Sequence, residues 1–146
     1  LLIDVTVAKL AAGNVNVSKI RALNKDLHTK SKTGKRNNMS DFLRANHRFH
    51  RYVAESSGNQ RLAVLASNLM EQHERIVHLG LAKQNRRQDF LHYHDEFVEA
   101  LINGDGESAG QIVETSLRKG QEKVMKALMM GSTDLISVVV KNLSLQ

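Results

Sequence analysis

The chain contains no proline in its 146 residues, and this absence constrains its fold more than any other feature. Proline ends or kinks an α-helix, and only nine glycines are present to weaken one. Apolar residues also recur three and four positions apart through most of the chain, which is the spacing of one helix face. We therefore expect an all-α domain, long enough to bury a core of its own.

This spacing predicts six helices, and glycines close several of them. Gly13, Gly58 and Gly104 each follow an apolar run and are typical residues to end a helix. The helices are expected at residues 1–12, 17–30, 40–57, 60–81 and 88–103, and from just after Asp105 to about Met129. Residues 131–146 form a separate tail, because Gly-Ser-Thr at 131–133 interrupts the pattern and a β-branched run follows. A strand, a seventh helix that completes a dimer contact and a poorly ordered end all stay open for this tail.

The positive charge of the chain limits its partners without choosing one. The net charge is +6, from 21 Lys and Arg against 15 Asp and Glu. Much of the excess lies between Lys25 and Arg36, around a Ser-Lys-Thr-Gly-Lys loop. A solvated loop is the simplest interpretation, while nucleic acid, a membrane surface and small acids are the possible anionic partners.

Residues that the chain lacks exclude several function classes. With no cysteine there is no disulfide, thiolate metal site or cysteine nucleophile, which is compatible with a reducing cytoplasm. The sequence has no nucleophile elbow, glycine-rich phosphate loop or HExxH helix. No apolar run approaches the roughly 20 residues of a membrane span. We therefore expect a cytoplasmic protein that is not an enzyme and has no membrane partner.

Polar residues fall on the apolar faces of four expected helices, where a buried imidazole or amide needs a partner. A single inward histidine is more often a satisfied core residue than a ligand, but convergence from several helices favours a shared binding interior. These candidates are Asn46 and His50 in the third helix, His73 in the fourth, His94 in the fifth and Ser116 in the sixth. His73 lies within the expected apolar stripe of the fourth helix, Leu62, Leu65, Leu69, Ile76 and Val77. The remaining histidines fall outside the stripes and are expected in solvent; they are His28, His47, His78 and His92.

Three of these residues are also candidate metal ligands. Asn46 and His50 are four residues apart, so they project from one helix face one turn apart, and His94 would add a second imidazole. The set is weak for zinc, because an amide oxygen is a poorer ligand than a carboxylate or a third imidazole. His73 would complete the set only if its helix faces the same interior.

Four segments together resemble the FCD effector domain, which follows the DNA-binding domain in many GntR-type transcriptional regulators. They are Asn46-His-Arg-Phe-His50, Gly58-Asn-Gln-Arg-Leu62, the stretch from His94 to Ala109 with its Ala-Leu and Gly-Asp pairs, and Ser116-Leu117. Their order and spacing agree with the family pattern over about residues 1–129.

The resemblance implies an antiparallel bundle of six or seven helices around a central ligand cavity. It also implies a homodimer that binds a small organic acid, often with a divalent metal held by one aspartate and three histidines. His50 and His94 match two of the histidine positions, whereas Asn46 stands at the aspartate position and Ser116 at the last histidine. A metal, if it binds, is therefore expected to be zinc or nickel and to be held weakly.

We accordingly expect residues 1–130 to be the effector-binding and dimerisation domain of a bacterial regulator, and 131–146 to be a tail. Because Leu1 already lies in a helix-compatible run, we expect the chain to begin inside a longer protein whose upstream winged-helix domain contacts DNA. Two alternatives remain, a basic helical nucleic-acid-binding module that uses the Lys25 to Arg36 cluster and a metal-dependent bundle enzyme. The arginines that could pair with an effector carboxylate are Arg44, Arg48, Arg51 and Arg75.

Overall fold

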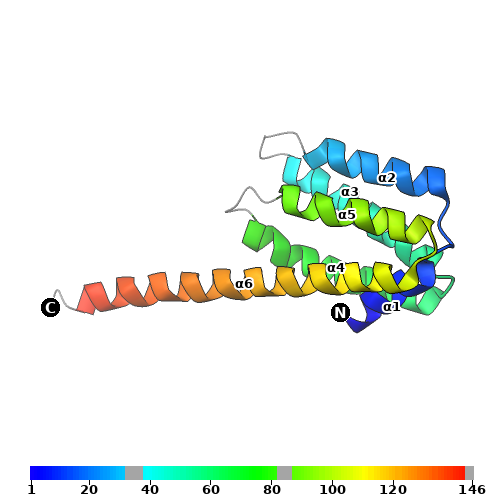
Figure 1. Ribbon diagram of the computed structural model, residues 1–146. Coiled ribbons are helices and arrows are strands. Elements are labelled where there is room, and N and C mark those ends of the chain that lie inside the picture. Colours follow the sequence, from blue (N-terminus) through cyan, green and yellow to red (C-terminus); the bar gives the residue numbers. More distant parts are fainter. Residues whose placement is uncertain (32–37, 82–86, 144–146) are drawn as a thin grey trace.

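The computed structural model describes residues 1–31, 38–81 and 87–143, and all the regular structure in these ranges is helical (Figure 1). The described helices are α1 (Leu2–Ala11), α2 (Val17–Ser31), α3 (Asn38–Ser56), α4 (Gln60–Leu81), α5 (Arg87–Ile102) and α6 (Gly106–Leu143). The all-α prediction is confirmed. Gly13, Gly58 and Gly104 have φ of 78°, 70° and 72°, as expected of glycines that end helices.

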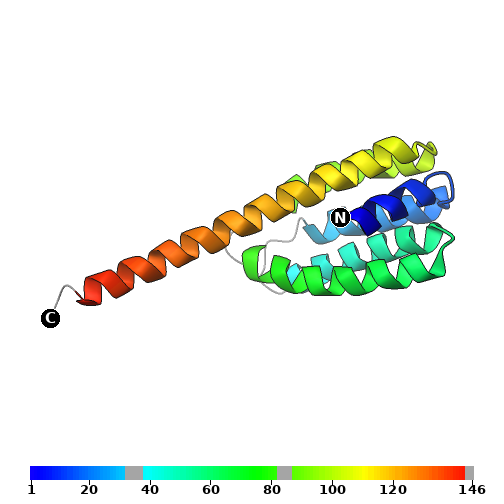
Figure 2. The same cartoon turned by 90° about the horizontal axis from the view of Figure 1, so that it is seen from below.

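Helices α2 to α6 form a closed ring, and the remaining helix, α1, fills one end of it. Around the ring α2 packs on α3, α3 on α4, α4 on α6, α6 on α5 and α5 on α2. The short helix α1 packs against α3, α4 and α6 (Figures 1 and 2). Short turns join α3 to α4 and α5 to α6, so each of these pairs runs antiparallel. Any cavity inside this arrangement is therefore bordered by α1.

The core is built from the apolar stripes that the sequence predicted for α2, α3 and α5. Its largest fully buried side chains are Phe49, Ile20, Leu27, Leu101 and Val98. These residues alternate with polar ones at helical spacing, so burying one face leaves the charged face in water. Burial of each such side chain contributes about 1.5–3 kcal/mol to stability before the loss of chain entropy is counted.

The expected stripe of α4 was wrong in part. Leu65 and Leu69 are 44% and 38% exposed, whereas Ala63 and Ala66 are buried. The physical reason is that α4 packs against α3 and α1 through its small residues, which lets the helices approach closely and turns the leucines outward. We had expected Leu65 and Leu69 in the core because hydrophobicity alone favours burial of the larger side chains.

Helix α6 is longer than predicted. It was expected to end near Met129, but it continues through Gly131 to Leu143, so the part of the tail that is described is helical and not a strand. A single glycine costs a helix interior only about 1 kcal/mol, which good helix formers on both sides offset. At its other end, a Cβ on Gly106 would lie 2.9 Å from the carbonyl oxygen of Lys9, so glycine allows α6 to approach α1 closely. No helix in the described ranges is both long and apolar enough to cross a membrane.

Candidate ligand-binding site

Two of the predicted site residues meet inside the bundle. The Nε2 atoms of His50, on α3, and His94, on α5, lie 3.1 Å apart within hydrogen-bond distance. One ring donates its N–H and the other accepts with a lone pair, so the contact requires that at least one ring be neutral. His94 is buried, at 6% exposed, and His50 is half-buried. The sequence pattern therefore placed these two histidines on the correct faces of their helices.

Phenylalanine rings hold the histidine pair in place. The ring of Phe49 packs edge-on against His50 and His94, with centroids 5.2 Å and 5.0 Å away. Phe97 also stacks on His50, with ring centroids 6.4 Å apart. Such edge and offset contacts are favourable and directional, so they fix the orientation of both imidazoles.

A small cavity of about 40 Å³ lies beside this pair. Five helices line it, α1, α3, α4, α5 and α6, and most of its wall is apolar. The polar lining comes from Asp4, His50, Arg51 and Ser67. This volume has room for a few water molecules but is small for an organic acid.

The structure does not bring every predicted residue to this cavity. Asn46 lies one turn before His50 and is half-buried, and Ser116 lies one turn beyond the lining residue Val113 and is also half-buried. Asn46, Ser116 and His94 are not among the described residues that line the cavity, so His50 is the predicted residue that reaches it. His73 belongs to α4, but its side chain falls outside the part of the chain that the structure describes.

Two lining residues were missed or left undecided by the sequence. Asp4 is an acidic residue among apolar neighbours in α1, and this contrast was the signal that could have identified it. Of the candidate arginines, Arg51 lines the cavity and bonds Glu55 at 2.9 Å, with 64% of its side chain exposed. Arg44 pairs with Asp41 and Arg48 with Asp26, while the side chain of Arg75 is outside the described residues.

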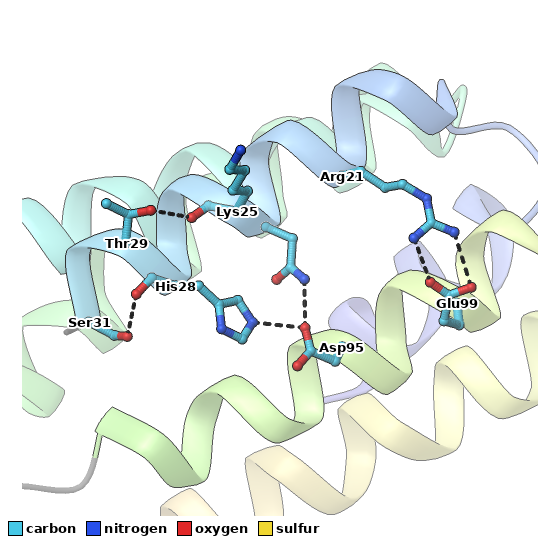
Figure 3. A network of polar contacts seen from close by, with 8 residues as sticks. Arg21, Lys25, His28, Thr29, Ser31, Asp95 and Glu99 are labelled. Atoms are coloured by element: carbon cyan, nitrogen blue, oxygen red, sulfur yellow. Dashed lines mark hydrogen bonds and ion pairs between the residues drawn. The ribbon is translucent and has the colours of Figure 1, made fainter.

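A polar network on the outside of the bundle fixes α5 against α2 (Figure 3). The guanidinium of Arg21 pairs with Glu99 at 3.0 Å, and Asp95 Oδ1 accepts from Asn24 at 2.7 Å and lies 2.8 Å from Nε2 of His28. Burial raises the pKa of Asp95, but hydrogen bonds from Asn24 and His28 lower it more, so its pKa falls below the usual value. Asp95 directly follows His94, so the two side chains leave α5 in different directions, with Asp95 bonded to α2 and His94 buried.

The prediction that histidines outside the stripes lie in solvent was only partly correct. His92 is exposed, whereas His28 is half-buried in the α2–α5 network. The Nε2 atom of His47 is buried without a hydrogen-bond partner among the described residues. His78 falls outside the side chains that the structure describes.

The donor set does not fit a tightly held metal ion. Two imidazole nitrogens bound to one tetrahedral zinc would be about 3.4 Å apart, close to the separation of the His50 and His94 nitrogens. A third donor is missing, however, because no group of three His, Cys, Asp or Glu residues in the described chain could hold a metal. The carboxylate and imidazole expected from the resemblance are replaced by Asn46 and Ser116.

A family comparison agrees with this arrangement. A family model for the FCD domain matches residues 1–119. The chain belongs to the FCD domain family. An FCD domain is the ligand-sensing part of a GntR-type transcriptional regulator. No curated protein and no solved structure matches the chain. In this FCD domain the matched residues include every described residue that lines the cavity.

Proposed function

We propose that this FCD domain senses a small organic acid in the interior cavity beside His50 and dimerises, as part of a bacterial regulator that binds DNA through another domain. The observation that carries the proposal is the ring of His50, which lines a cavity where five helices meet and is held 3.1 Å from the buried ring of His94. Polar groups in a bundle interior need a reason to be there, and a ligand is one.

The charges at the cavity favour an acid. Arg51 lines it and carries a fixed positive charge, and its guanidinium can form two parallel hydrogen bonds with a carboxylate. To do so it exchanges the carboxylate of Glu55, which lies on the same helix one turn away. Asp4 on the α1 side accepts hydrogen bonds, so an acid that also carries a hydroxyl or amino group is the best match.

The size of the cavity explains how binding of a ligand would change the arrangement of the helices. A guest too large for a cavity of about 40 Å³ has to move part of its lining, side chains or helices. The packing of α4 on α6 is the least extensive in the ring, whereas α1 packs closely on α6, so the wall opens most easily where α4 meets α6. Because a ligand shifts an equilibrium only through its differential affinity, an acid that fits the widened form would favour that form.

Thermal-shift measurements on the purified chain with a panel of small carboxylates and sugar acids test the proposal. An acid that binds the folded state stabilises it by RT ln(1 + c/Kd), where c is the free acid concentration, so Tm rises with the logarithm of c once c exceeds Kd. The rise in Tm should be lost in His50→Ala and in Arg51→Ala, and kept in the matched surface variants His92→Ala and Arg44→Ala. An acid whose stabilising effect survives His50→Ala and Arg51→Ala would bind elsewhere and contradict the proposal.

A nucleic-acid-binding module remains the alternative function. Its evidence is the basic stretch from Lys25 to Arg36, of which residues 32–37 lie outside the described chain. Phosphate contacts make binding steeply dependent on salt, so tight and salt-sensitive binding of random duplex DNA by this chain would favour the alternative.

A further inference from the structure

The turn between α5 and α6 contains the only Asn-Gly pair and the only Asp-Gly pair of the chain, Asn103-Gly104 and Asp105-Gly106. This turn also touches the end of α1. The backbone N–H of Gly13 donates to the carbonyl oxygen of Leu101 at 2.8 Å, and a Cβ on Gly13 would lie 3.5 Å from the Cα of Gly104. A chemical change in the turn would therefore disturb the place where α1 meets the end of α5.

Asn103 has the surroundings of an asparagine that deamidates. Asparagine is a chemically labile residue, and glycine after it has no Cβ to hinder the approach of its backbone nitrogen to the side-chain carbon of the asparagine. Asn103 and Gly104 are both exposed to water. The nitrogen of Gly104 is held loosely, since it lies 3.4 Å from the carbonyl oxygen of Leu101, whereas about 2.9–3.0 Å is usual. Helix ends such as this one also open locally at little cost in free energy.

Other exposed asparagines at described turns differ from Asn103. Each is followed by a residue that has a side chain, and each has its own side chain bonded to the backbone. Asn14 donates to the carbonyl oxygen of Leu10 at 2.8 Å, Asn16 accepts from the N–H of Lys19 at 2.9 Å, and Asn59 accepts from the N–H of Leu62 at 3.1 Å. Among the described residues, none bonds the side chain of Asn103.

We propose that Asn103 is a site of spontaneous deamidation in the folded chain. The nitrogen of Gly104 loses its proton to water, attacks Cγ of Asn103 and expels the side-chain nitrogen as ammonia, which closes a five-membered succinimide ring. Water then opens the ring. Attack of water at Cγ leaves an ordinary aspartate, whereas attack at the backbone carbonyl carbon leaves an isoaspartate, whose main chain runs through Cβ and Cγ. In both cases the net change is hydrolysis of one amide to a carboxylate and ammonia.

Asp105 is protected from the corresponding reaction. Its two carboxylate oxygens accept from the backbone N–H of Ser108 at 2.9 Å and from the hydroxyl of Ser108 at 2.6 Å. These bonds lower the pKa of Asp105, and an ionised carboxylate resists attack by nitrogen. The nitrogen of Gly106 is also bonded, to the carbonyl oxygen of Gly104 at 3.1 Å. The reaction is therefore expected at the Asn-Gly pair and not at the Asp-Gly pair.

Modification of Asn103 should loosen the turn. The new carboxylate would lie at the C-terminal end of α5, where the helix dipole is negative, and one turn from Glu99. An isoaspartate also adds one atom to the main chain. This atom would displace Gly104 from Gly13 and strain the 2.9 Å bond that the N–H of Asp105 donates back to α5. The modified chain should therefore unfold at a lower Tm.

Peptide mapping by mass spectrometry tests the proposal on the natural chain, incubated at mildly alkaline pH in the folded state and, in parallel, unfolded in urea. Aspartate and isoaspartate should accumulate first at residue 103, with isoaspartate in excess, while Asn14 stays intact. Because the end of α5 opens easily, the rate in the folded chain should be within about tenfold of the rate in urea. The Tm of the folded chain should fall as the modification proceeds.

Three variants serve as controls. Asn103→Gln should keep its Tm through the same incubation, because the longer side chain closes a ring far more slowly. Asn14→Gln, on the opposite side of the same contact, should lose Tm on incubation as the natural chain does. Asn103→Asp has the new charge but the ordinary main chain, so its Tm should lie between those of the fresh and the fully modified natural chain.

Two results would overturn the proposal. One is a residue 103 that stays intact in the folded chain while it is modified in urea, since the fold would then protect it. The other is faster modification of Asn14 or Asp105 than of Asn103 in the folded chain.

Discussion

His50 and His94 are 44 positions apart in the sequence, yet their Nε2 atoms lie 3.1 Å apart inside the bundle. The contact joins α3 to α5, two helices that are not neighbours in the ring. His50 also lines the cavity, whereas His94 lies behind it and outside the lining. This pair is the polar centre of the domain.

Removing the buried member of the pair should destabilise the fold. His94→Ala deletes a ring packed against Phe49 and leaves the nitrogen of His50 without its partner. We expect a loss of about 1–3 kcal/mol in the free energy of unfolding, measured by urea denaturation. His92→Ala, which removes an exposed histidine from the same helix, should change it by less than about 0.5 kcal/mol. Equal effects of the two variants would argue against the pair.

Filling the cavity should separate ligand binding from stability. Ala66 lines the cavity, so Ala66→Val has room for its added methyl groups and should keep the free energy of unfolding within about 1 kcal/mol. The same variant should abolish the acid-induced rise in Tm. Ala63→Val is on the same helix at a buried position that does not line the cavity, and it should cost about 1–3 kcal/mol. A full acid response in Ala66→Val would place the ligand outside this cavity.

The start of α6 should give the domain an acid-sensitive contribution to stability. Asp105 accepts hydrogen bonds from the hydroxyl and the backbone N–H of Ser108, and these bonds lower the pKa of its carboxyl. A lowered pKa in the folded state means that the stabilisation is complete above the unfolded value of about 4 and is lost as pH falls through the folded value.

Asp105→Asn tests this sign, because asparagine caps a helix as well as aspartate but does not titrate. Its free energy of unfolding should match that of the natural chain near neutral pH and fall less steeply below about pH 4. Chemical denaturation across this range measures both. If the free energy of unfolding fell equally with pH in the natural chain and the variant, protonation of Asp105 would contribute nothing to the acid sensitivity.

Restoring the family ligands should create a metal site. The double variant Asn46→Asp, Ser116→His adds a carboxylate and an imidazole next to His50 and His94, and zinc affinity measured by competition with a chelator should rise by at least about 100-fold. Adding His94→Ala to this variant should remove the gain. Stoichiometric zinc in the purified natural chain would contradict the conclusion that its residues do not hold a metal tightly.

The sequence predicted the helices well because periodicity, glycine stops and the Asp105 cap are local signals. It also placed His50 and His94 on inward faces. It could not predict that α4 would bury Ala63 and Ala66 in place of Leu65 and Leu69, because the closeness of α3 and α4 depends on the whole bundle. The same holds for Asp4 and Arg51, whose approach to one cavity joins α1 to α3 across the interior. The end of α6 was misjudged because one glycine was given more weight than its helix-forming neighbours.

The most direct measurement is a crystal structure of the chain with the acid that stabilises it most. The account predicts electron density for the acid in a widened cavity, with its carboxylate on Arg51 and its remaining polar groups facing His50 and Asp4. Density in another place, such as the open groove between α2 and α5 that Lys25 and Asp95 line, would contradict it.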